Sequence, residues 1–142
     1  MRLLLLAVAV ALAGCAGDDN ETAPATTAST MSTASSCTKA TAALMTPLAN
    51  KVMLADAQLT NPWIVKSAEQ DDVYFVAAEI DSPDLRSTGD VAVWATSNPT
   101  GGAPIYSVDR LARRSSEWPD AAETDIAADD PAIAESRSCV SR

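Results

Sequence analysis

The stretch that decides the fold is VYFVAAEI, residues 73–80, which is apolar at odd and even positions alike. Successive side chains of a β-strand point to opposite faces of the sheet. A strand with this pattern is therefore buried on both sides. We expect 73–80 to be a central strand of a sheet that is covered, at least in part, on each face.

Three further runs of strand-forming residues surround the central one. They are PWIVKSAE (62–69), VAVWATS (91–97) and PIYSVD (104–109). The connections are a short polar turn at Asp71 and Asp72, an acidic loop over 81–90, and NPTGGA (98–103), which has the Pro/Gly chemistry of a hairpin turn. Because parallel pairs need long crossovers, these connections predict a four-stranded antiparallel meander.

Two helices are predicted at the ends of the domain. In residues 37–59, helical spacing relates Cys37, Thr41, Leu44, Leu48 and Val52. Pro47 either kinks this helix or opens a second short helix that Thr46 caps. At the other end, DDPAIAESRSCV (129–140) predicts a helix with Asp130 as N-cap and Pro131 in its first position. The fold class is α+β, and both helices are expected to share one face of the sheet.

The N-terminus has the features of a signal peptide over residues 1–14. Arg2 is followed by an apolar run, 3–13, that is too short for a membrane span of roughly 20 residues. The end of the run, Leu12-Ala13-Gly14-Cys15, resembles the lipobox of bacterial lipoproteins. The resemblance implies that Cys15 receives a diacylglyceryl group, becomes the new N-terminus, and anchors the chain in membrane lipid on the outer face of the cell membrane. The alternative is an ordinary secretory signal with a chance cysteine.

Residues 15–36 are expected to form a stalk, headed by the lipidated cysteine. The segment is rich in Ser, Thr and Ala and too poor in large apolar residues to bury a core, so we expect it to be disordered. Asn20-Glu21-Thr22 fits the N-glycosylation pattern, which we interpret as a coincidence, and O-glycosylation of the threonines near Pro24 is the alternative.

The folded domain is then residues 37–142. If the resemblance holds and Cys15 is lipidated, Cys37 and Cys139 are the only cysteines left, in an oxidising compartment. A Cys37–Cys139 disulfide would close a loop of about 100 residues and stabilise the fold by about 4–5 kcal/mol in the chain-entropy model.

The composition of the chain excludes several classes of function. The chain carries 10 Lys+Arg against 19 Asp+Glu, a formal charge of -9, which argues against a nucleic-acid partner. It contains no His, which removes Ser-His-Asp and Cys-His catalysis. No phosphate-binding loop, nucleophile elbow or dinucleotide fingerprint is present, so we expect no cofactor and no enzyme activity.

A basic segment, DRLARRSSEWPD (109–120), is the candidate binding patch. If it is helical, Arg110, Arg113 and Arg114 lie on one face, with Trp118 just beyond. Arginine beside an aromatic residue is common at interaction hot spots. The alternative is a solvated face that neutralises the acidic loops.

Two sets of acidic residues are candidates for a metal site and a hydrolytic site. Asp71, Asp72, Asp81, Asp84 and Asp90 could gather oxygen ligands for Ca²⁺, but their spacing fits no EF-hand loop, so no metal is expected. Glu79 and Glu117 are the only candidates for a carboxylate pair that hydrolyses a glycosidic bond.

The blocks VYFVAAEID, GDVAVWATS and IYSVD resemble small secreted or lipid-anchored proteins of high-GC Gram-positive bacteria. This resemblance spans about residues 37–140 and implies a fold but no activity. We expect a lipid-anchored, extracytoplasmic binding or interaction domain with an envelope protein as a candidate partner. The alternatives are a small carboxylate-dependent cell-wall hydrolase and a surface factor that blocks an envelope protein, as in superinfection exclusion.

The predicted lipid anchor at Cys15 can be tested by a substitution. Replacing Cys15 by Ser removes the thiol that lipidation requires, so the variant should be released to the medium or remain unprocessed. Fractionation of cells that express each form measures this. Membrane association equal to that of the unaltered chain would contradict the anchor.

Overall fold

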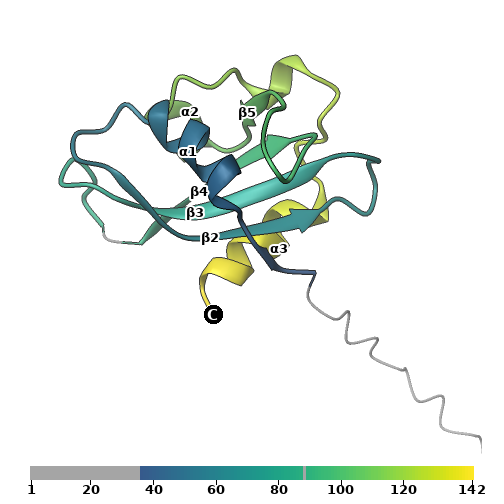
Figure 1. Cartoon of the computed structure of the whole chain (residues 1–142), viewed down its shortest axis with the longest axis horizontal. Helices are drawn as coiled ribbons and strands as arrows, with labels where there is room; N and C mark the ends of the chain where they lie inside the picture. The colour runs from purple at the N-terminus through teal and green to yellow at the C-terminus, as the bar shows by residue number, and fades with distance from the viewer. Residues whose placement is uncertain (1–35, 88) are drawn as a thin grey trace, which may run out of the picture. The chain divides into compact units, whose positions relative to one another are not determined.

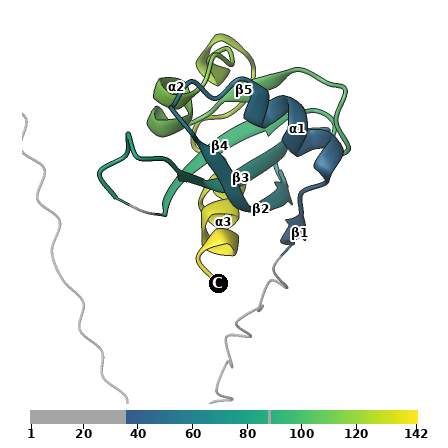
Figure 2. The same ribbon diagram turned by 60° about the vertical axis from the view of Figure 1, so that its left-hand side comes forward.

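The computed structural model describes residues 36–87 and 89–142. The predicted signal peptide, Cys15 and all but the end of the predicted stalk lie outside these residues. The elements, drawn in Figures 1 and 2, are β1 (Thr38–Lys39), α1 (Ala42–Asn50), β2 (Gln58–Lys66), β3 (Tyr74–Asp81), β4 (Asp90–Thr96), β5 (Ile105–Ser107), α2 (Arg110–Ser115), the 3₁₀ turn η1 (Ala121–Glu123) and α3 (Pro131–Val140).

The sheet is antiparallel throughout, with the strands in chain order from β1 to β5. The predicted α+β class and antiparallel meander are confirmed, but the sheet has five strands rather than four. The additional strand is β1, which pairs Thr38 with Ile64 and Lys39 with Trp63 (Figure 2). It was predicted as the start of the first helix.

The helix cannot include β1 because Thr41 is its N-cap. The Thr41 backbone is extended (φ −78°, ψ 152°), and its side chain accepts a hydrogen bond from the Leu44 amide. A cap of this type fixes the start of the helix at the next residue and leaves the preceding chain extended. Residues 38 and 39 are thereby free to pair with β2.

Both faces of the central strand β3 are buried, as its sequence predicts. Val76, Ala78 and Ile80 belong to a core with Leu44 and Leu48 of α1. On the other face, Phe75 and Ala77 pack in a second core with Ile133 and Val140 of α3.

The two terminal helices therefore lie on opposite faces of the sheet, and the expectation that they share one face is wrong. Figure 1 shows α1 and α2 above the strands and α3 below them. The physical reason is the apolar pattern of β3 itself, since covering only one face would leave Phe75 and its neighbours in water.

Helix α1 is a single helix with Pro47 inside it, not two helices divided at Thr46. The Thr46 hydroxyl donates to the Ala42 carbonyl at 2.9 Å and so does not cap a new helix. Proline has no amide to bond the carbonyl four residues earlier, which is that of Ala43. The backbone of Gly101, in the β4–β5 loop, approaches this carbonyl closely: a Cβ on Gly101 would lie 2.8 Å from the Ala43 oxygen.

Helix α3 begins as predicted, with Asp130 as N-cap and Pro131 in the first turn. Asp130 is 2% exposed; one carboxylate oxygen accepts from the Ala132 amide at 2.8 Å and the other from the Ser67 hydroxyl. This pair of bonds ties the start of the helix to the β2–β3 turn.

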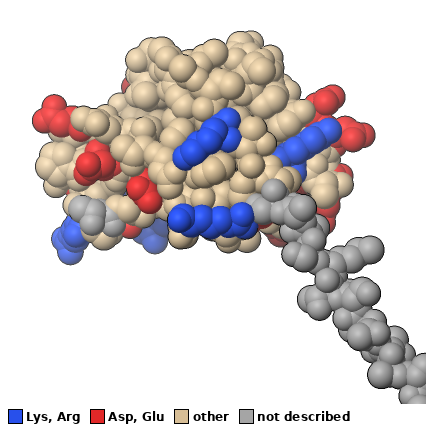
Figure 3. Space-filling view, turned by 60° about the horizontal axis from the view of Figure 1, so that its bottom comes forward, with Lys and Arg blue, Asp and Glu red and all other residues tan. Residues whose placement is uncertain are grey.

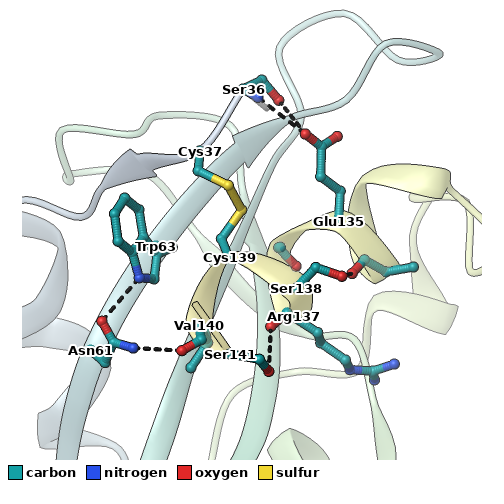
Figure 4. The surroundings of a disulfide bond; sticks show 12 residues. Ser36, Cys37, Asn61, Trp63, Glu135, Arg137, Ser138, Cys139, Val140 and Ser141 are labelled. Atoms are coloured by element: carbon teal, nitrogen blue, oxygen red, sulfur yellow. Dashed lines mark hydrogen bonds between the residues drawn. A yellow bond between two sulfur atoms is a disulfide. The ribbon is translucent and has the colours of Figure 1, made fainter. Parts of the chain in front are cut away.

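The end of α3 is held at the predicted Cys37–Cys139 disulfide, whose Cα atoms are 5.9 Å apart (Figure 4). Next to it, Asn61 sits in a bulge of β2 with a positive φ of 48°. Its amide nitrogen donates to the Val140 carbonyl at 2.6 Å, and its amide oxygen accepts from the Trp63 indole at 3.0 Å. Lys39 lies 4.0 Å from the centroid of the Trp63 ring. The two ends of the domain are thus joined.

Two neighbouring glycines test the contact between α1 and the β4–β5 loop. Gly101 and Gly102 both have positive φ, 95° and 83°, so alanine at either position is strained by about 1–2 kcal/mol. Only Gly101 also faces a backbone clash, since nothing lies within 4 Å of a Cβ on Gly102. Gly101→Ala should therefore cost about 1–3 kcal/mol more in free energy of unfolding than Gly102→Ala, as measured by urea denaturation. Equal losses in the two variants would contradict the contact.

Candidate functional site

The predicted basic segment forms the short helix α2, and Asp109 positions it. One Asp109 oxygen accepts from the Ala112 amide at 2.7 Å and so caps the helix. The other accepts from the Val93 amide of β4 at 3.1 Å and from the Arg137 guanidinium of α3 at 2.8 Å. One carboxylate therefore fixes α2 to the sheet and to the helix on the far face.

The four residues of the predicted patch lie in two different environments. Arg113 pairs with Asp120 at 3.1 Å. The Ala122 amide and, after it, Arg113 hold the pKa of the Asp120 carboxyl below its ordinary value. Trp118 packs against the α1-side core, and its indole nitrogen donates to the Leu48 carbonyl at 3.4 Å. Arg113 and Trp118 thus have structural partners.

Arg110 and Arg114, one turn apart on α2, instead line a groove between α2 and the 82–90 loop. Two adjoining hollows, of about 460 and 310 Å³, make up this groove and share Asp90, Leu111 and Arg114. We call it the arginine groove; its lining residues are Leu54, Asp84, Leu85, Arg86, Asp90, Arg110, Leu111, Arg114 and Ser115.

Arg86 is the charged residue of the groove that sequence reasoning missed. It lies in the loop 81–90, whose acidic and turn-forming residues indicate a solvated connection. Nothing in its spacing connects it to α2, 24 positions later. The antiparallel pairing of β3 with β4 turns this loop back toward α2, which packs against β4.

The three arginines of the groove are available for a ligand. The ion pairs among the described residues are Lys51–Glu117, Arg113–Asp120 and Arg137–Asp109, so Arg86, Arg110 and Arg114 take part in none of them.

The two acids in the groove wall each accept a hydrogen bond, Asp84 from the segment before β2 and Asp90 from the β3–β4 loop. Asp84 accepts from the Ala55 amide at 3.0 Å, and Asp90 from the Ser87 hydroxyl at 2.7 Å. The groove therefore presents guanidinium donors beside an apolar surface formed by three leucines, which suits an anionic group with an aliphatic neighbour.

The two acidic sets weighed from the sequence are not assembled into sites. Over residues 36–87 and 89–142, no three Asp, Glu or Cys side chains gather as a metal-binding group. Glu79 lies on the α3 face of β3, where Thr60 donates to it at 3.4 Å. Glu117 follows α2 on the other side of the sheet and pairs with Lys51 at 3.4 Å. The two carboxylates do not face one another.

Buried hydroxyls near the arginine groove have structural roles. Ser116 accepts from the Trp94 indole at 3.1 Å and donates to the Ala112 carbonyl at 2.7 Å. Ser107 bonds the Ser116 hydroxyl and the Trp118 carbonyl, both at 3.2 Å. With no histidine in the chain, these serines have no imidazole base, and their hydrogen bonds fix Trp94 in the core.

On the face that Figure 3 presents, Lys and Arg side chains are spread over the surface, and Asp and Glu side chains lie toward its two sides. None of the helices in the described part of the chain is long and apolar enough to span a membrane. Comparison with protein-family models, curated proteins and solved structures gives no match to this chain.

Proposed function

We propose that this chain is a lipid-anchored, extracytoplasmic binding domain whose arginine groove holds an acidic segment of an envelope protein. The lipobox-like sequence at Cys15 supports the location. The observation that carries the binding role is the convergence of Arg86, Arg110 and Arg114 on one groove without a carboxylate partner among the described residues.

The chemistry of the groove favours a carboxylate. A guanidinium presents donors in a planar fork that matches the two oxygens of a carboxylate, and such charge-assisted bonds are about twice as strong as neutral ones. Leu54, Leu85 and Leu111 add an apolar surface beside the arginines. A peptide that alternates acidic and aliphatic side chains satisfies both parts of this lining.

The negative net charge of the chain limits binding to acidic groups that reach the arginines directly. A chain of formal charge -9 repels anions in general. Beyond a Debye length of about 8 Å at physiological salt this repulsion is screened. Only an acidic group that reaches the guanidinium groups directly gains from them, so binding depends on the local fit of the groove.

The proposal assigns no reaction to the groove. Its carboxylates, Asp84 and Asp90, are engaged in loop hydrogen bonds, and Glu79 and Glu117 lie on different sides of the sheet. A factor that blocks an envelope protein would use the same contacts, because blocking is binding at a functional surface of the partner.

Matched peptides test the groove. We expect the purified full chain to bind acetyl-Glu-Leu-Glu-amide and not acetyl-Gln-Leu-Gln-amide, with amide chemical-shift changes in 84–90 and 110–115. The double variant Arg86→Gln/Arg114→Gln should weaken binding at least about tenfold, since a hydrogen bond to a charged group contributes about 1.5–3 kcal/mol. Its free energy of unfolding should stay within about 0.5 kcal/mol of the unaltered chain, because both side chains are exposed.

Lys51→Gln is the control, because Lys51 is also an exposed cation but pairs with Glu117 outside the groove. It should leave peptide binding unchanged. Equal binding of the Glu and Gln peptides, or a marked loss of stability in the arginine variant, would support the alternative that these arginines are a solvated neutralising face.

A further inference from the structure

A second hollow, of about 270 Å³, lies on the α1 side of the sheet and shares no residue with the arginine groove. It is bounded by Ser36 and β1, the start of α1, the end of β2, the start of β3 and the β4–β5 loop. Its apolar lining comes from Ile64, Tyr74 and Pro99. It is slightly smaller than the roughly 300–1,000 Å³ of pockets that hold drug-sized molecules, so it suits a smaller ligand.

Hydroxyl groups surround this apolar lining and retain hydrogen-bonding capacity. The Thr41 oxygen accepts from the Leu44 amide, which leaves its O–H as a donor. The Thr100 hydroxyl donates to the Asn98 side chain at 2.7 Å, which leaves its lone pairs as acceptors. Thr38 and Tyr74 also line the hollow, and their hydroxyls have no hydrogen bond to any residue in the described ranges. The hollow thus offers both donors and acceptors.

Two lysines complete the lining, Lys39 and Lys66, and they differ in their partners. The Lys66 ammonium lies 5.9 Å from the centroid of the Tyr74 ring and takes part in no ion pair among residues 36–87 and 89–142. Lys39 also contributes to the lining, but its ammonium is engaged by Asn61 at 2.7 Å and by the Trp63 ring. Lys66 is therefore the charge that a ligand in this hollow would meet.

We infer that this hollow is a binding site for one acidic sugar ring, a pyranose that carries a carboxylate. The C–H face of the ring packs on Tyr74 and Ile64, the ring hydroxyls pair with the threonine hydroxyls, and the carboxylate pairs with Lys66. An apolar carboxylic acid would cover the threonine hydroxyls without pairing them, which costs binding free energy. A neutral sugar would forgo the ion pair with Lys66.

Two sugars that differ only in the group on C5 test this site. Glucuronic acid carries a carboxylate where glucose carries a hydroxymethyl group. We expect glucuronate to shift the amide resonances of residues 38–41, 64–66, 74 and 100 in the purified full chain. Glucose should bind at least about tenfold more weakly, the ratio expected for one charge-assisted hydrogen bond.

Two variants test the charge and the threonine hydroxyls. Lys66→Gln should abolish the preference for glucuronate over glucose, and Thr38→Val, which removes one threonine hydroxyl from the lining, should weaken both sugars. Arg86→Gln should change neither, which separates this site from the arginine groove.

Three results would overturn the assignment. They are the absence of shifts at these amides at sugar concentrations of tens of millimolar, equal binding of glucose and glucuronate, and binding of acetate as strong as that of glucuronate. The last result would show a simple anion contact at Lys66 that uses none of the hydroxyls.

Discussion

Burial of β3 on both faces is the constraint on which the rest of the structure depends. Phe75, Val76, Ala77, Ala78 and Ile80 are all 1% exposed or less. A sheet with such a central strand must be covered by a layer on each face. In this domain the covering helices α1, α2 and α3 have only nine, six and ten residues. Isolated helices shorter than about 12–15 residues are marginal in water, so these helices depend on their attachments.

Helix α3 packs on the other face of the sheet, and three attachments hold it there. Asp130 bonds the first turn of the helix and Ser67, Arg137 pairs with Asp109, and Cys139 is joined to Cys37 at the other edge of the sheet. Ser36, the first described residue, also donates to Glu135 at 3.1 Å through its amide (Figure 4). The chain therefore enters the domain on α3, directly beside the disulfide.

Asp109 links helix α3 to α2, the helix that carries part of the candidate site. It caps α2, accepts a hydrogen bond from the Val93 amide of β4, and pairs with Arg137 of α3. Because α2 carries Arg110 and Arg114, the geometry of the arginine groove depends on a residue that also anchors the opposite layer. The groove and the second hollow are each lined by both polar and apolar side chains.

Local signals in the sequence were sufficient to predict the elements that depend on neighbouring residues. The two-sided pattern of 73–80, the Asp130-Pro131 start of α3 and the turn at 98–103 each follow from chemistry within a few positions. The strand β1 could not be predicted in this way, because its two residues form a strand only by pairing with β2, which lies beyond the whole of α1 in the sequence. The same holds for the candidate site: Arg110 and Arg114 were found by helical spacing, whereas Arg86 joins them only through the β3–β4 pairing.

The Cys37–Cys139 disulfide holds α3 over the apolar face of β3. Amide hydrogen exchange of the unaltered chain and of the Cys37→Ser/Cys139→Ser variant tests this role, because exchange resolves local opening within a folded domain. The amides of 133–140 should lose protection first and most in the variant, followed by those of β2 and β3, while those of α1 should lose least. Unchanged protection of 133–140 in a variant that stays folded would contradict it.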